Sequence, residues 1–287
     1  MLKYGAAQLL LHEARRINPR FELHDLDVPH VVQVCHLTQG LPLALELAAT
    51  WLRVLKLSDV VEEIKSALDF LSGGRRDAGA RHASMRAVFE HSWSLLSPSE
   101  QTTLRNLAVF RGGFTSTAAA EVAGASLADL AALVDKSLLR VSSGGRYDRH
   151  PLLYQFTLEK LGEHPEELRV ARERHGAFYL QLLTEFGSVW DRHPKAAMDT
   201  LALELENVRA LNWAVPARAS HDELRVAVAA LGIYFDMCGQ YGAGLELFNR
   251  LSHLWEPHGQ AGELTAQVWC GGNAPGLTSS GVASIRR

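Results

Sequence analysis

The chain of 287 residues has few cysteines and no long apolar run. Its three cysteines, Cys35, Cys238 and Cys270, form no CxxC pair, which argues against a disulfide framework or a cysteine-rich zinc site. No run of about 18 uncharged apolar residues occurs, so we expect no membrane-spanning helix. The N-terminus also lacks the apolar core and cleavage site of a signal peptide. These absences predict a cytoplasmic protein with reduced thiols and no membrane contact.

The sequence also lacks an excess of charge of either sign. It has 29 Lys and Arg against 32 Asp and Glu, a formal net charge of −3, which gives no electrostatic reason to expect a polyanionic partner. It contains no HExxH and no G-x-S-x-G sequence. We therefore expect no metal site and no catalytic residues. The length is that of two domains, or of one domain and a repeat array.

Apolar residues recur at helical spacing in the first 72 residues. Four helices are predicted, and Asp27 and Ser58 are expected to cap the second and the fourth. The first helix starts without a cap or a leading strand, which suggests that the chain begins inside a larger domain. Residues 73–80 combine glycines and charges without an apolar period, so they are predicted to be a linker.

Residues 81–162 predict three helices, a small hairpin and a further helix, which is the layout of a winged helix. Within Ser97-Pro98-Ser99-Glu100, the serine at 97 and the glutamate at 100 have the spacing of a capping box. Ser126 is expected to cap the helix that precedes the hairpin. A turn at residues 142–145 separates two short strands, and Pro151 opens the last helix.

Residues 163–260 predict antiparallel helices that resemble a tetratricopeptide-like superhelix, without a clean repeat. Residues 261–287 lose the period and are rich in Gly, Ser and Asn, so they are expected to be disordered or foreign to the fold. The predicted fold class is therefore all-α with one small β-hairpin wing.

Several segments, in this order, resemble signatures of the STAND-class signalling NTPases. This class includes NB-ARC proteins and bacterial regulators of the LuxR-type or AfsR-like kind. Gly-Leu-Pro-Leu-Ala at residues 40–44, followed by Glu-Leu-Ala at 46–48, resembles the GLPLAL motif of their helical lid. The remaining matches span the winged helix and the start of the superhelix, namely residues 89–97, 107–114, 133–139, 147–153 and 205–211. The likeness covers residues 5–255 and makes residues 1–72 a helical lid.

The resemblance implies three residues at a nucleotide. Leu41 and Pro42 stand in the lid loop, where the family's proline packs on the base. His150 stands where the family's histidine reaches the β-phosphate of ADP and holds the closed state. Its neighbours Arg149 and Pro151 replace the methionine and aspartate usual in that segment. The residues alone also allow a plain helix break at Pro42 and a helix cap at His150.

The family's phosphate loop, catalytic aspartates and arginine sensor precede the lid and are not found in this chain. The nearest phosphate-loop pattern, residues 271–278, has Leu277 where a lysine would neutralise the phosphates. Without a phosphate cradle and a magnesium site, the chain is expected not to hydrolyse ATP by itself. We therefore expect no cofactor for this chain alone, and ADP or ATP in full-length relatives.

Three functions follow from these patterns. The first is a regulatory module whose helical array binds a protein partner or effector, with self-association as a further option. The second is an ADP- or ATP-binding switch completed by another chain. The third is a winged-helix transcription factor. Its reading helix, residues 126–136, would present Asp129, Asp135 and a single Lys136, which argues against DNA binding.

Overall fold

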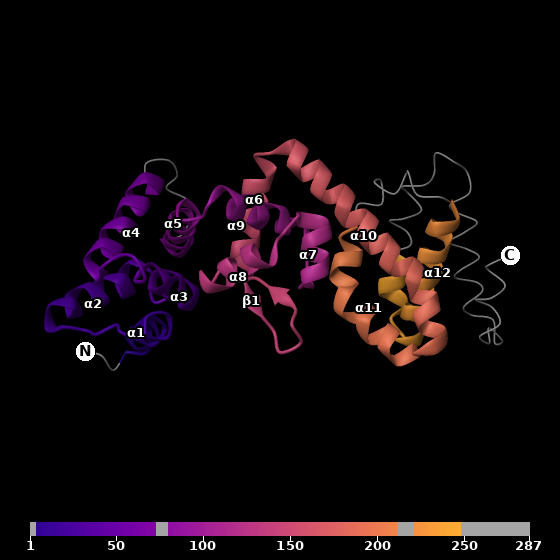
Figure 1. Cartoon of the computed structure of the whole chain (residues 1–287), viewed down its shortest axis with the longest axis horizontal. Coiled ribbons are helices and arrows are strands. Elements are labelled where there is room, and N and C mark those ends of the chain that lie inside the picture. Colours follow the sequence, from indigo (N-terminus) through magenta and orange to yellow (C-terminus); the bar gives the residue numbers. More distant parts are fainter. Residues whose placement is uncertain (1–3, 73–79, 212–220, 248–287) are drawn as a thin grey trace. The chain divides into compact units, whose positions relative to one another are not determined.

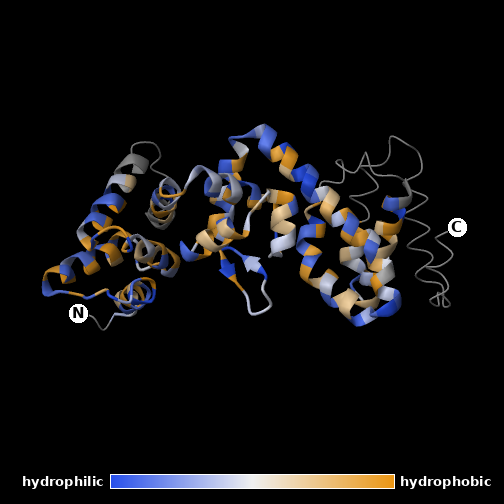
Figure 2. Ribbon diagram, in the orientation of Figure 1, coloured by the Kyte–Doolittle hydropathy of each residue, from blue (hydrophilic) through white to orange (hydrophobic). Residues whose placement is uncertain are grey.

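The computed structural model describes residues 4–72, 80–211 and 221–247 (Figure 1). These residues are almost entirely helical, with one antiparallel pair of two-residue strands, so the predicted fold class is confirmed. Figure 2 shows hydrophobic and hydrophilic residues in alternating bands along the helices, as expected for amphipathic helices that bury one side. Most of the predicted linker, at 73–79, and the whole predicted tail lie outside the described residues.

The chain divides into two compact units, and each is built from two separate segments. Unit 1 comprises Met1–Arg105 and Ala125–Lys160, and unit 2 comprises Asn106–Gly124 and Leu161–Arg287. The backbone therefore passes between the units at 105–106, 124–125 and 160–161. This division runs through the segment predicted as a winged helix.

Unit 1 is built from helices and one hairpin, and it includes most of the first 160 residues. Its elements are α1 (Gly5–Ile17), η1 (Asp25–Asp27), α2 (Val28–Leu37), α3 (Pro42–Trp51), α4 (Leu57–Ser72), α5 (Ala80–Ser94), α6 (Pro98–Asn106), α8 (Leu127–Asp135), β1 (Arg140–Val141), β2 (Tyr147–Asp148) and α9 (Pro151–Gly162). The helices α6 and α9 cross into the residues of unit 2 at their last positions. In the first five helices, α1 packs on α3, and α4 packs on α2 and α5.

Trp51 lies at the centre of these helices. Its side chain is 1% exposed, and its indole nitrogen donates to the hydroxyl of Ser92 on α5 at 3.2 Å. The imidazole of His91 lies 4.1 Å from the Trp51 ring and 3.1 Å, by its Nδ1 atom, from the carboxylate of Glu63 on α4. The buried ring of Trp51 thus connects α3 to α5, His91 extends the connection to α4, and the single polar atom of the ring is satisfied.

The predicted hairpin is formed by β1 and β2. Arg140 pairs with Asp148 and Val141 with Tyr147. Gly145 closes the turn with a φ of +72°, a conformation that glycine adopts without steric cost.

The helix caps predicted at Ser97 and Ser126 are confirmed, the cap at Asp27 is confirmed in position only, and the cap at Ser58 is wrong. Ser97 and Glu100 form the expected reciprocal capping bonds at 3.3 and 2.7 Å. Ser126 likewise caps α8. Asp27 is the N-cap residue of α2, but its carboxylate makes no capping bond and accepts from the His24 amide at 3.1 Å. Ser58 is the second residue of α4, because that helix begins at Leu57.

Unit 2 is organised around its longest helix. Its described elements are η2 (Leu107–Val109), α7 (Ser116–Ala123), α10 (Pro165–Arg192), α11 (Pro194–Arg209) and α12 (His221–Met237), followed by helical residues 241–247. The 28-residue helix α10 packs against η2, α7, α11 and α12. Helix α7, which the sequence assigned to the winged helix, therefore belongs by packing to the helices that follow residue 161.

An aromatic cluster forms the core of unit 2 beside η2. The rings of Phe110 and Phe114 stack at 4.7 Å, and His175 of α10 lies edge-on to Phe110 at 5.5 Å. His175 is 3% exposed and also contacts the ring of Tyr179 at 4.7 Å. Removal from water disfavours the charged imidazole and lowers the pKa of His175 from its ordinary 6.5 to about 4.

Among the described helices, no single one has both the length and the hydropathy to cross a membrane. The consecutive helices α7 and α8 meet the criterion only when counted together, by length and composition alone.

Protonation of His175 is expected to make the stability of unit 2 depend on pH. Its folded pKa, about 4, lies below the unfolded value near 6.5, so the unfolded state binds more protons between these pH values. The free energy of unfolding should therefore fall by about 3 kcal/mol as the pH drops from 6.5 to 4. Urea titrations at several pH values would measure this loss.

The variant His175→Phe should remove most of this pH dependence, because phenylalanine fills a similar volume and does not titrate. The matched control is His193→Gln, which changes an exposed histidine of the same unit. Equal pH dependence in His175→Phe and in the unmodified protein would contradict the assignment.

Candidate functional site

The turn between α2 and α3 presents Leu41 and Pro42. Two successive residues with positive φ, Gln39 at 51° and Gly40 at 65°, reverse the chain. Leu41 is extended, with φ −67° and ψ 122°, as the residue before a proline prefers. Pro42 is the first residue of α3, where its missing N–H costs nothing. Pro42 is exposed and Leu41 is half-buried, so the proline ring lies at the surface of unit 1.

His150 directly precedes α9 and caps it. Its Nδ1 atom accepts from the Leu152 amide at 3.2 Å, and its carbonyl accepts from the Tyr154 amide at 3.0 Å. The capping role that the sequence allowed for His150 is therefore present. Because Nδ1 is an acceptor, the neutral imidazole holds its proton on Nε2, which remains a donor for another group.

An ion pair links α3 to the hairpin next to His150. Nη2 of Arg140, on β1, lies 2.8 Å from Oε2 of Glu46, whose side chain is 23% exposed. Glu46 stands four residues after Pro42 on α3, so both lie on the same helix face. The Arg140 side chain is 58% exposed, so the pair contributes at most about 1 kcal/mol to stability. The main effect of this ion pair is to fix the positions of the two charges, and its contribution to stability is small.

The surroundings keep His150 neutral. Partial burial is the largest cause that lowers the pKa of His150, and the positive charge of Arg140 lowers it further. The carboxylate of Glu46 acts in the opposite direction. A neutral imidazole with its proton on Nε2, close to a guanidinium, is a donor arrangement suited to a phosphate oxygen.

The structure therefore places His150 within electrostatic reach of Glu46 on α3, the helix that Pro42 begins. Leu41 and Pro42 make no hydrogen bond or ion pair with His150, and the connection runs through Glu46 and Arg140. Sequence reasoning missed these two residues. A usable signal was present, because Glu46 is the single charged residue in an otherwise apolar and largely buried helix.

The exposed side of α8 is apolar and acidic. Leu127 is 71% exposed, and Ala128 and Ala131 are exposed beside it. The ammonium of Lys136 is 2.7 Å from both carboxylate oxygens of Glu100, so this cation is already paired. The helix that would enter the groove in a DNA-binding winged helix thus offers no unpaired cation for phosphates or base edges.

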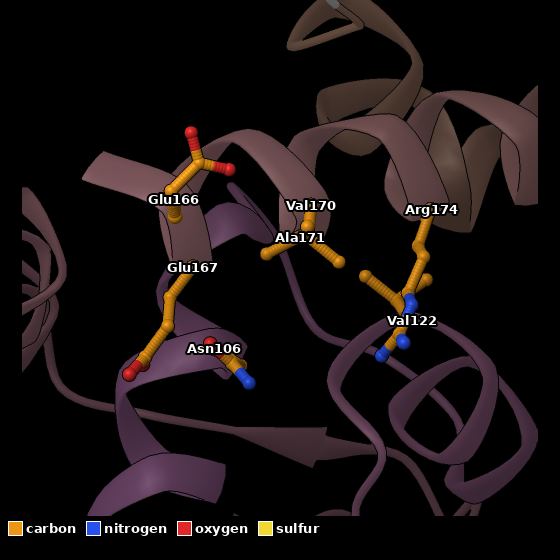
Figure 3. Close-up of a pocket in the computed structure, with 7 residues that line it drawn as sticks. All are labelled: Asn106, Val122, Glu166, Glu167, Val170, Ala171 and Arg174. Atoms are coloured by element: carbon orange, nitrogen blue, oxygen red, sulfur yellow. The ribbon is translucent and has the colours of Figure 1, made fainter. Parts of the chain in front are cut away.

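Unit 2 contains a cavity of about 230 Å³ between α7 and the first half of α10 (Figure 3). It is lined by Asn106, Val122, Glu166, Glu167, Val170, Ala171 and Arg174. Figure 3 shows Glu167 directed toward Asn106 and Arg174 toward Val122. The cavity is smaller than the roughly 300–1,000 Å³ of typical small-molecule sites.

The part of the chain that the structure describes contains no group of three His, Cys, Asp or Glu side chains arranged to hold a metal ion.

Comparison with known proteins finds mycobacterial relatives. Proteins of Mycobacterium tuberculosis and Mycobacterium bovis, provisionally named HTH-type transcriptional regulators, are 29% identical to this chain over 257 residues, which is 86% of the chain. An uncharacterized protein of Mycobacterium tuberculosis is 30% identical over 176 residues, 58% of this chain and 45% of that protein. The chain is thus similar to these proteins along most of its length.

The chain spans only 29% of the length of the two named regulators. No protein-family model matches the sequence. No solved structure matches it either.

The two charges beside His150 are expected to shift its pKa in opposite directions. Arg140→Gln should raise the pKa of His150, because it removes the neighbouring positive charge, and Glu46→Gln should lower it. A histidine-selective NMR titration of the imidazole would measure both shifts. The control Arg20→Gln removes an exposed arginine elsewhere in unit 1 and should leave the titration unchanged. Shifts of the same sign in both variants would contradict the arrangement.

Proposed function

We propose that the chain is a regulatory and protein-interaction module of a STAND-type, ATPase-linked transcriptional regulator. It binds protein partners and does not hydrolyse ATP by itself. The observation that carries the proposal is the similarity over 86% of the chain to proteins named transcriptional regulators. The ordered series of lid, winged-helix and superhelix motifs supports the finer assignment to the STAND class.

In this proposal the helical array of unit 2 presents a surface to a protein partner or effector, and self-association is a further mode of binding. Stacked antiparallel helices commonly offer extended surfaces of this kind. Exposed apolar residues on α10, α11 and α12 support a role in contact with protein, namely Val189, Leu203 and Met237.

The names of the relatives do not imply that the predicted winged helix of this chain binds DNA. The matched region is 29% of each named regulator, so their DNA-binding part need not lie within it. In this chain, the apolar outward side of α8 and the pairing of Lys136 with Glu100 support contact with protein instead.

A second candidate function is a nucleotide switch completed by another chain. The observation that favours it is the Nε2 donor of His150, beside Arg140 and near the helix that Pro42 begins. Bound ADP would supply phosphate oxygens for His150 and a base for Pro42. No residue of the described segments is proposed to catalyse hydrolysis, and Leu277 at the phosphate-loop-like segment supports that view.

A transcript profile tests the regulatory proposal. Deletion of the gene in its host should change the abundance of a defined set of transcripts, and the unmodified gene should restore it. The variant Lys195→Gln, at an exposed position of α11, should restore it equally and serves as the control. An unchanged profile after deletion would overturn the proposal.

Duplex DNA should not bind the chain. Titration of a labelled duplex at low and moderate salt, followed by fluorescence anisotropy, should show no saturation below about 100 µM, since non-specific binders saturate at or below that range. The variant Glu100→Gln frees Lys136 and is a sensitised comparison. Salt-dependent saturation by the unmodified chain would favour the transcription-factor alternative.

Calorimetric titration with magnesium and ADP separates the two proposals. We expect no saturable heat for the chain alone at millimolar ADP. Saturable micromolar binding that is lost in both Pro42→Ala and His150→Ala would instead support the switch. Arg20→Gln is the matched control for such a loss.

A further inference from the structure

The turn that precedes α7 is held by one side chain from α11. The Oδ1 atom of Asn207 accepts from the backbone amides of Arg111 and Gly112 at 2.9 and 3.1 Å. Its Nδ2 atom donates to the carbonyl of Gly113 at 2.9 Å. A single amide side chain therefore bonds three successive residues that lie more than ninety positions earlier in the sequence.

The side chain of Asn207 is itself held in place. Asn207 is fully buried, and its Nδ2 atom also donates to Oε2 of Glu204 at 3.0 Å. The same carboxylate oxygen accepts from the hydroxyl of Tyr179, on α10, at 2.9 Å. Glu204 is 4% exposed and Tyr179 is fully buried. We call Tyr179, Glu204 and Asn207 the amide clamp.

The clamp acts on a segment that is not continuous with the rest of unit 2. Residues 106–124 leave unit 1 and return to it, and between these crossings they form η2, the turn and α7. Packing of Phe110 and α7 against α10 attracts this segment but is non-directional. Hydrogen bonds in a buried network are directional and specify one arrangement.

We propose that Asn207 is a positioning residue that fixes the 111–113 turn to α11, so that α7 moves as part of the helical array. A partner that shifts the array would then displace α7 directly. The clamp contains none of the residues proposed to face a nucleotide, so the failure of either idea leaves the other standing.

Hydrogen–deuterium exchange tests the proposal on the full chain. In Asn207→Ala, the amides of Arg111 and Gly112 lose the Asn207 oxygen as an acceptor, and the Gly113 carbonyl loses the Asn207 amide as a donor. Peptides that cover residues 107–123 should exchange faster by roughly tenfold to a hundredfold, as expected when three hydrogen bonds of one turn are lost together. Peptides from α12 in unit 2 and α8 in unit 1 should keep their original rates.

Two controls separate the clamp from general effects. Glu204→Gln should leave exchange near its original rate, because one amide oxygen can accept from both Tyr179 and Asn207, as the carboxylate oxygen does. Gly112→Ala should also be tolerated, since its added Cβ would lie 3.5 Å from Cβ of Glu206 and 3.8 Å from Nδ2 of Asn207. If Asn207→Ala does not fold, Tyr179→Phe removes one bond of the clamp and should give a smaller acceleration with the same pattern.

The outcomes are distinct. Faster exchange confined to residues 107–123 supports the proposal. Unchanged exchange there in Asn207→Ala overturns it. Equal acceleration in α12 also overturns it, because the clamp would then contribute only to the overall stability of unit 2.

Discussion

The requirement that buried polar groups find hydrogen-bond partners governs the most specific contacts of this protein. Apolar burial draws the helices together but leaves many packings nearly equal in free energy. The indole of Trp51, the carboxylate of Glu100 and the amide of Asn207 are satisfied only in one arrangement. Each of these groups joins segments far apart in the chain, and together they select which helices become neighbours.

The distance along the chain between hydrogen-bond partners decides which features the sequence predicts. The capping boxes at Ser97 and Ser126 and the hairpin were predictable, because every group in them lies within a few residues. The departures from the predicted caps are also local. At Asp27 the carboxylate accepts from the amide three residues before it, and α4 begins two residues earlier than a cap at Ser58 predicts.

Long-range contacts were beyond sequence reasoning. The periodicity of residues 116–123 predicts a helix but says nothing about which unit buries it, and α7 packs against α10. The resemblance indicated Leu41, Pro42 and His150. Glu46 stands out as the single charged residue of its helix, but nothing in the sequence pairs it with Arg140, 94 residues later. The motif around Asn207 was visible, but its role depends on a turn ninety-five residues earlier.

The threading of the backbone between the units has a consequence for how such proteins diversify. Because the chain crosses at 105–106, 124–125 and 160–161, no single junction in the gene separates one unit from the other. A recombination event near residue 160 would transfer α10 and the helices after it without residues 106–124, and α10 would lose the helix that covers it. Exchange of the helical array between genes should therefore succeed in two cases. Either residues 106–124 are exchanged together with the array, or the new array already packs against the residues 106–124 that are present.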